Sequence, residues 1–133
     1  MNTTTIIDNE NVAVWYHEDH KIVHHTFKCV VKGAQFREAL TKGAEAMEAN
    51  HCTKWLSDDR GNTVLPEDDE KWATSIWFPR VCSAGWKHWA LVLPTKAVGQ
   101  LNVQRFAETY AQFGINAKFF TDPDEAMKWL QEQ

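Results

Sequence analysis

One short stretch of the chain, Asp58-Asp59-Arg60, places two adjacent carboxylates beside a guanidinium group. Such a group of charges can orient the polar part of a ligand, or shift the pKa of one carboxyl for acid–base chemistry. The stretch leads into Gly61 and Asn62, so a solvated turn with an internal ion pair is the competing interpretation. Because no histidine or nucleophile lies beside these residues in sequence, we do not expect an enzyme.

Tryptophan is concentrated around the same stretch, since five of the seven tryptophans lie between residues 55 and 89. In a helix that begins near Pro66, i,i+4 spacing predicts that Trp72 and Ile76 share a face, with Trp77 and Phe78 on adjacent faces. This apolar surface indicates a broad buried face, the wall of a cavity or a partner interface. The candidate residues from this segment are Trp72, Ile76, Trp77, Phe78 and Trp86. Trp55 and Trp89 fall on predicted strands and are expected in the core.

The six histidines and three cysteines form no recognisable metal or nucleophile pattern. His24 and His25 are consecutive on a predicted strand, so their side chains should point to opposite faces. His17 and His20 flank a predicted turn and are expected in solvent. The cysteines are odd in number and include no Cys-x-x-Cys pair, which predicts neither a disulfide framework nor a zinc site. We therefore expect no metal and no cofactor.

The candidate site residues are positioned by a chain in which strands and helices alternate. Residues 12–17 and 21–28 are rich in β-branched and aromatic side chains and flank a polar turn, which predicts an antiparallel hairpin. Residues 34–50 have apolar residues at helical spacing. Further predicted elements are a strand at 53–57, a helix from 66 to 78, a strand at 86–93, a helix at 98–113, a strand at 115–120 and a helix at 123–130.

Local signals set the ends of these helices. Pro79 is expected to interrupt the aromatic helix, and Gly114 has the position of a left-handed residue that ends the next one. Asp122 followed by Pro123 is typical of a capped helix start. The order predicts an α/β fold with a single mixed β-sheet, an N-terminal antiparallel hairpin followed by parallel βα units with packed helices. Residues 1–133 should form one domain, because the sequence has no linker or repeat.

Composition excludes several classes of function. The net charge of −4 argues against nonspecific nucleic-acid binding, which needs a basic face. The amino terminus has no basic start followed by a long apolar core, so it does not resemble a signal peptide. No apolar run approaches the length of a membrane-spanning helix, so we expect no integral membrane segment and a cytoplasmic protein.

Three portions of the chain carry a family resemblance: residues 54–60, residues 84–92 and the closing residues 120–130. Together with the predicted order of strands and helices, these portions resemble the SpoIIAA-like branch of the STAS superfamily. That branch includes anti-anti-sigma factors and small proteins related in shape to CRAL-TRIO lipid-transfer domains. The resemblance spans residues 12–130 and implies the SpoIIAA-like fold and a small apolar or amphipathic ligand.

The chain departs from that family at its regulatory motif. Anti-anti-sigma proteins carry a phosphorylatable Ser or Thr in an Asp-Ser/Thr-x-Gly motif, and this chain has Asp58-Asp59-Arg60-Gly61 in that place. Aspartate cannot be phosphorylated as serine is, although it supplies a fixed negative charge. Ser57 precedes the aspartates and is not expected to replace the missing hydroxyl. We therefore do not expect a kinase-driven switch.

Three hypotheses follow from the sequence. The leading one is a non-enzymatic regulatory or ligand-binding module, possessing an apolar site under the aromatic helix and a recognition rim at Asp58, Asp59 and Arg60. The second is a protein–protein interaction module, in which the aromatic helix packs on another copy of the chain or on a signalling partner. The third is a small enzyme that uses Asp58 or Asp59 as a base with Arg60 as its electrostatic partner.

Overall fold

The computed structural model describes residues 2–62 and 65–133, and within them six strands form one sheet in the order β1-β2-β3-β4-β5-β6. The first three strands pair antiparallel, and β3 to β6 pair parallel. The predicted α/β class, with a hairpin followed by parallel βα units, is confirmed. The strands are β1 (Thr3–Asp8), β2 (Val12–His17), β3 (Ile22–Phe27), β4 (Lys54–Asp58), β5 (His88–Val92) and β6 (Asn116–Phe120).

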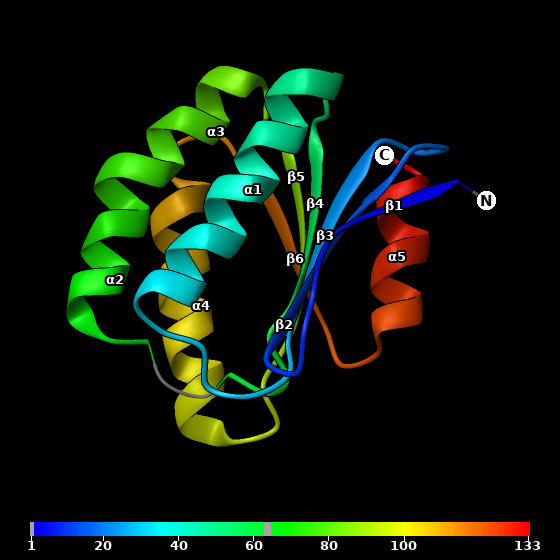
Figure 1. Cartoon of the computed structure of the whole chain (residues 1–133). Coiled ribbons are helices and arrows are strands. Elements are labelled where there is room, and N and C mark those ends of the chain that lie inside the picture. Colours follow the sequence, from blue (N-terminus) through cyan, green and yellow to red (C-terminus); the bar gives the residue numbers. More distant parts are fainter. Residues whose placement is uncertain (1, 63–64) are drawn as a thin grey trace.

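Helices cover the two faces of the sheet unequally (Figure 1). Among the described residues, one face carries three helical segments, and we call it the pocket face. The other carries only the C-terminal helix of this part of the chain, and we call it the α5 face. The segments on the pocket face are α1 (Ala34–Asn50), the continuous run α2 (Glu67–Trp72), η1 (Ala73–Trp77) and α3 (Phe78–Ala84), and α4 (Ala97–Ala111). Helix α5 (Pro123–Gln131) packs on β4, β5 and β6.

Strand β1 was not among the elements expected from the sequence. It pairs antiparallel with β2 at the edge of the sheet, and its side chains are mostly exposed. Its run of threonines and isoleucines has the β-branched composition of a strand, but it lacks the alternation of polar and apolar residues that marks a half-buried one. An exposed edge strand leaves little pattern in the sequence for that reason.

The prediction that Pro79 interrupts the aromatic helix is wrong. The helix runs on to Ala84 because a π-helical turn, η1, precedes the proline, and the amide of Phe78 bonds to the carbonyl of Ala73. A proline in a regular α-helix clashes with the carbonyl four residues earlier, and a widened turn is one way to relieve that clash. The segment between Phe78 and Gly85, which has no clear sequence signal, is helix α3.

The π turn also changes which side chains share a face. Ile76 is 61% exposed, whereas Trp77 and Phe78 are 4% and 5% exposed. The expected i,i+4 partnership of Trp72 with Ile76 is therefore wrong. A π turn adds one residue to the helix, with hydrogen bonds between residues five apart, so Trp77 takes the inward position below Trp72 that Ile76 would have in a regular α-helix.

The two faces have separate apolar cores. The larger core lies on the pocket face and includes Trp55, whose ring packs so closely on α1 that any Cβ at Gly43 would overlap it. The smaller core lies under α5 and is formed by Ile22, Leu56, Ala90, Val92, Ala126 and Leu130. The predicted start of α5 is confirmed, because the carboxylate of Asp122 accepts a hydrogen bond from the amide of Asp124 at 2.9 Å.

Candidate functional site

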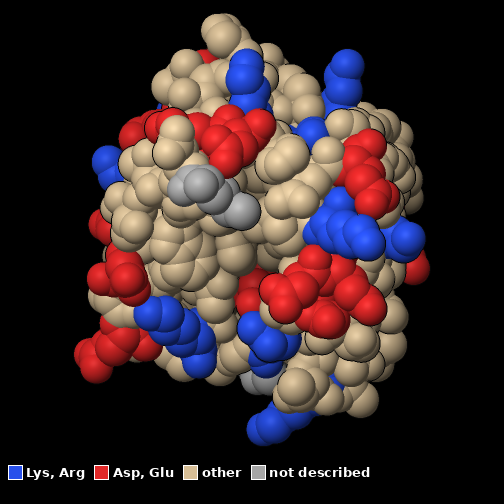
Figure 2. Space-filling model, turned by 90° about the vertical axis from the view of Figure 1, so that its right-hand side faces the viewer, with Lys and Arg blue, Asp and Glu red and all other residues tan. Residues whose placement is uncertain are grey.

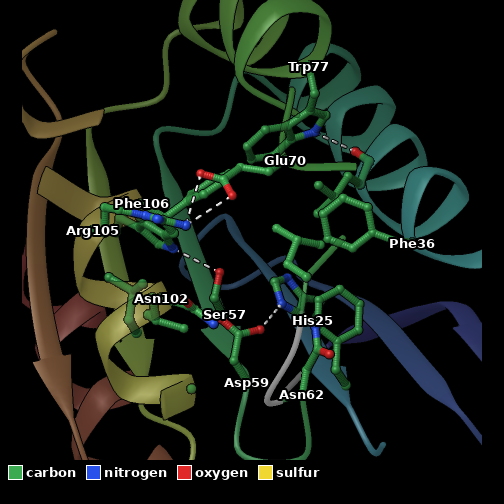
Figure 3. A pocket seen from close by; sticks show the side chains of 17 residues that line it. His25, Phe36, Ser57, Asp59, Asn62, Glu70, Trp77, Asn102, Arg105 and Phe106 are labelled. Atoms are coloured by element: carbon green, nitrogen blue, oxygen red, sulfur yellow. Dashed lines mark hydrogen bonds and ion pairs between the residues drawn. The ribbon is translucent and has the colours of Figure 1, made fainter. Parts of the chain in front are cut away.

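A pocket with a cavity volume of about 80 Å³ opens on the pocket face of the sheet, between strands β3 to β5 and the helices above them (Figure 3). Most of its wall is apolar. The apolar lining comprises Phe27, Phe36, Leu40, Leu65, Trp77, Trp89, Leu91, Gly99, Val103 and Phe106. The polar lining comprises His25, Ser57, Asp59, Asn62, Glu70, Asn102 and Arg105.

Two tryptophans in the wall are held by their indole nitrogens. The Nε1–H group of Trp77 donates to the backbone carbonyl of Leu40 at 2.8 Å, which ties η1 to α1. The Nε1–H group of Trp89 donates to the hydroxyl of Ser57 at 2.8 Å, across β5 and β4. With their polar atoms satisfied within the protein, both rings present apolar surface to the pocket, and the walls are fixed before any ligand enters.

A chain of hydrogen bonds forms the polar end of the pocket. The Nε1–H group of Trp55 donates to Nδ1 of His25 at 2.9 Å, and Nε2 of His25 lies 2.9 Å from Oδ1 of Asp59. Because an indole nitrogen is only a donor, Nδ1 of His25 must be the acceptor, and Nε2 carries the hydrogen that it donates to Asp59. Both ring nitrogens are thus occupied. His25 is a neutral group that orients Asp59 rather than a base with a free lone pair.

The loop after β4 delivers Asp59 to this position. Its amide donates to the carbonyl of Val92 at 3.1 Å, which continues the pairing of β4 with β5 by one residue. Gly61 then passes so close to the end of β3 that a Cβ there would meet the backbone of Lys28 at 2.6 Å. Asn62 closes the loop, since its side-chain oxygen accepts from the amide of Val31 at 3.3 Å. Only glycine at position 61 allows this close approach.

The predicted trio Asp58, Asp59 and Arg60 is divided between the two faces of the sheet. Asp58 is buried on the α5 face, where both of its oxygens accept from the guanidinium of Arg60 at 2.9 and 2.8 Å. This bidentate bond to Asp58 raises the pKa of Arg60 above its usual value, and Asp122 and Asp124 add to the effect. Figure 2 shows the α5 face, with acidic and basic side chains in contact with one another. Of the three residues, only Asp59 lines the pocket.

The remaining predicted site residues have different positions. Trp77 lines the pocket, while Phe78 and Trp86 are buried behind it in an aromatic cluster with Tyr110, on which Phe78 stacks at 3.9 Å between ring centroids. Trp72 is half-buried against Phe36, with ring centroids 6.3 Å apart.

The aromatic helix therefore contributes two wall residues, Glu70 and Trp77, and a rigid aromatic support behind Trp77. Ile76 points to solvent.

An ion pair connects two helices that border the pocket. The guanidinium of Arg105 on α4 lies 3.1 Å from Oε2 and 3.4 Å from Oε1 of Glu70 on α2. Asn102 lies one turn earlier on α4 and has no side-chain hydrogen bond within the described residues. Figure 3 shows Asn102 on the same side of the pocket as Ser57 and Asp59. These polar groups come from segments far apart in the sequence.

Sequence reasoning missed most of the polar lining. The useful signal was present for His25, which alternates with Val23 and Phe27 on β3 and so shares their inward face. The same alternation places Ser57 on the face of Trp55 in β4. No comparable signal marks Glu70, Asn102 or Arg105, because their meeting depends on how α2 and α4 cross the sheet. The separation of Asp58 from Asp59 follows the period of two along an extended strand.

The histidines follow the same alternation. His24 and His25 point to opposite faces as predicted, and His24 lies on the α5 face with its Nδ1 atom 3.1 Å from Nε2 of His17. Burial is the main cause that lowers the pKa of His24 to about 3, and His17 and His25 add to it. His17 is half-buried, which corrects the expectation that it is solvated, and burial lowers its pKa too. Within residues 2–62 and 65–133, no group of three or more potential ligands could hold a metal ion.

Comparison with known protein families, with curated proteins and with solved structures found no match. None of the helices in the described residues is long and apolar enough to cross a membrane.

Proposed function

We propose that this chain is a non-enzymatic, cytoplasmic binding module of the SpoIIAA-like type, and that it holds a small amphipathic molecule in the pocket between α1, α2–η1 and α4. The observation that carries the proposal is the division of the pocket into aromatic walls and one polar end, around a cavity of about 80 Å³. Sites for small molecules commonly combine apolar walls with a few converging polar groups.

The size of the cavity narrows the ligand. One buried water occupies roughly 10–15 Å³ of such a cavity. The cavity of about 80 Å³ therefore has room for a compact molecule several times larger than a water. A molecule with one ring or a short branched chain fits this space. A phospholipid with full acyl chains is larger than this space, so the cavity agrees with the small apolar or amphipathic ligand that the family resemblance implies.

The hydrogen bonds support a binding role over catalysis. The enzyme hypothesis needs a base with a free lone pair and an electrostatic partner beside it. Asp59 keeps an oxygen without a hydrogen-bond partner in the described residues, but its neighbours are not available as partners. Both nitrogens of His25 are engaged, by Trp55 and by Asp59. Arg60, the electrostatic partner in the enzyme hypothesis, is bonded to Asp58 on the α5 face. Positioning of a ligand is the role that these contacts favour.

The interaction hypothesis has less surface available than the sequence suggests. Trp77 and Phe78 are buried in the chain itself, and Ile76 is the exposed apolar residue of the η1 turn. Association through this helix would therefore depend on Ile76 and its polar neighbours. We regard ligand binding as the better supported function.

A screen of fragment-sized molecules by saturation-transfer NMR tests the proposal. Fragments should bind the wild-type protein at millimolar concentration and should lose binding in Val103→Trp, because Val103 lines the pocket and the larger ring fills it. Val98→Trp is the matched control, since Val98 is on the same helix, is 56% exposed and does not line the pocket.

Thermal melting of both variants checks that they fold. The proposal fails if no fragment binds the wild-type protein, or if the fragments bind Val103→Trp as well as they bind Val98→Trp.

A further inference from the structure

We infer that the ligand is a small amphipathic cation, with an aromatic or compact apolar body and a protonated amine or amidine that binds the carboxylate of Asp59. This inference rests on the proposed function, because it names the ligand class of the same pocket. Three features of the pocket support it: its charge balance, the geometry of Asp59 and the aromatic surface beside it.

The charges that line the pocket leave one carboxylate without a cationic partner. Arg105 and Glu70 pair with each other at 3.1 Å. His25 is neutral in the arrangement set by Trp55, so its contact with Asp59 is a hydrogen bond that does not cancel the charge. Arg60 is bonded to Asp58 on the other face of the sheet. The polar end of the pocket is therefore negative.

Asp59 is oriented for contact with a ligand. Its Oδ1 atom accepts from Nε2 of His25, while Oδ2 has no hydrogen-bond partner within the described residues. The side chain is 14% exposed, so the free oxygen is partly shielded from water. Ion pairs and charge-assisted hydrogen bonds are stronger in such a setting than on an open surface. A cation would gain more from this oxygen than a neutral group would.

Neighbouring groups complement a cation with several N–H donors. Asn102 also lines the pocket, and its side chain makes no hydrogen bond within the described residues. Its side-chain carbonyl is therefore free to accept a second hydrogen bond from the ligand. The faces of aromatic rings also attract cations. Phe27, Trp89 and Phe106 line the pocket with Asp59, and the ring of Phe27 lies 4.3 Å from that of His25. The same surroundings disfavour a carboxylate or phosphate.

The charge of the ligand that the pocket favours differs from the charge that the sequence led us to expect. A recognition rim with an arginine would accept the headgroup of a fatty acid or a phospholipid. In the folded chain, the arginine next to Asp59 in sequence is on the other face, and the arginine at the pocket is paired with Glu70. An anionic headgroup would meet the Asp59 carboxylate without a free counter-charge.

Three probes of similar size and different charge test the inference by isothermal titration calorimetry. They are phenethylammonium, the neutral phenethyl alcohol and the anion phenylacetate. We expect phenethylammonium to bind at least about tenfold more tightly than either of the others at low salt. Asp59→Asn should remove this preference, and it should leave the affinity for phenethyl alcohol within about twofold, because asparagine keeps the oxygen that accepts from His25.

Asp58→Asn is the matched control, because it makes the same chemical change one residue away on the α5 face and should keep the preference for the cation. If the alcohol or the anion binds as tightly as the ammonium, the ligand class is wrong while the binding function stands. If the cation preference survives in Asp59→Asn, the assignment to Asp59 is wrong. If none of the probes binds and the fragment screen is also negative, both proposals fall.

Discussion

The two faces of the sheet place the same residue types in different settings at the carboxyl end of the parallel strands. On the α5 face, Asp58 is buried and bonded at both oxygens to Arg60. On the pocket face, Asp59 lines the cavity and has one oxygen bonded to the neutral ring of His25, while the other has no hydrogen-bond partner within the described residues. A fully paired carboxylate stabilises the fold, whereas a half-paired one can bind something else.

The histidines of β3 repeat this contrast. His24 is buried on the α5 face beside His17, and His25 is held on the pocket face between Trp55 and Asp59. Alternation along a strand is enough to separate neighbours in the sequence into different environments. Substitutions that change one face at a time test whether the two faces differ in this way.

The largest effect should come from the aromatic support of the pocket face. Trp55→Ala removes a fully buried ring and the donor to His25, and we expect it to lower the free energy of unfolding by about 3–5 kcal/mol. Urea denaturation measures the loss. Leu130→Ala, under α5, should also destabilise, by about 2–5 kcal/mol.

Nitrogen NMR of the imidazoles distinguishes these two variants. The signals of His25 should move in Trp55→Ala and should remain in place in Leu130→Ala. An unchanged His25 spectrum in Trp55→Ala would show that the indole does not fix the ring.

A smaller effect should appear as a pH dependence that arises on the α5 face. The pKa of His24 is about 3 in the folded chain and near 6.5 when unfolded, so the unfolded chain binds more protons between these values. Stability from this group is present above pH 6.5 and is lost as the pH falls towards 3. We expect a loss of about 2 kcal/mol from His24 between pH 7 and pH 5.

Urea denaturation at the two pH values checks this prediction. His24→Gln should reduce the loss between them by that amount, while His20→Gln, at the exposed hairpin turn, should retain it. An equal loss in both variants would mean that His24 is already protonated in the folded chain at pH 5.

The two adjacent aspartates should differ in their contribution to stability. Asp58→Asn weakens a bidentate bond to Arg60, which is half exposed, and we expect a loss of about 1–2 kcal/mol in the free energy of unfolding. Asp59→Asn keeps its bond to His25 and should cost less than about 1 kcal/mol. Thermal melting of the two variants side by side makes the comparison. A larger loss for Asp59→Asn would reverse the roles assigned to the two faces.

The smallest effect is expected at the surface of the aromatic helix. Ile76→Ala changes a side chain that is 61% exposed, so the free energy of unfolding should change by less than about 0.5 kcal/mol. Trp77→Ala, one residue along the chain, removes a buried ring and should cost about 3–5 kcal/mol. Urea denaturation measures both losses. A larger loss in the free energy of unfolding for Ile76→Ala than for Trp77→Ala would show that the π turn does not point Trp77 inward and Ile76 outward.

Much of the fold could be predicted because its signals are local. The hairpin, the helix that begins at Ala34 and the cap at Asp122 each depend on residues within one element. Strand β1 could not be found in this way, since an edge strand with exposed side chains has no alternating pattern. The π turn before Pro79 was missed because the usual rule for proline assumes a regular α-helix.

The candidate site was less predictable because it depends on neighbours that are distant in sequence. Asp59 and Trp77 could be identified from turn chemistry and aromatic content, and both line the pocket. The grouping of Asp58 and Arg60 with Asp59 fails because adjacent residues in an extended chain alternate between faces. Asn102 and Arg105 were not identifiable, since their approach to β4 is set by the packing of α4.

A titration observed through the indole N–H signals in a nitrogen–proton NMR spectrum tests most directly whether a ligand enters the pocket. With phenethylammonium as the ligand, the signals of Trp77 and Trp89 should shift, because both rings line the cavity. The signals of Trp129, on α5, and of Trp15, which contacts His24 on the α5 face, should remain still. Shifts confined to Trp15 and Trp129, or no shift at Trp77 and Trp89 at saturating ligand, would show that the pocket does not bind phenethylammonium.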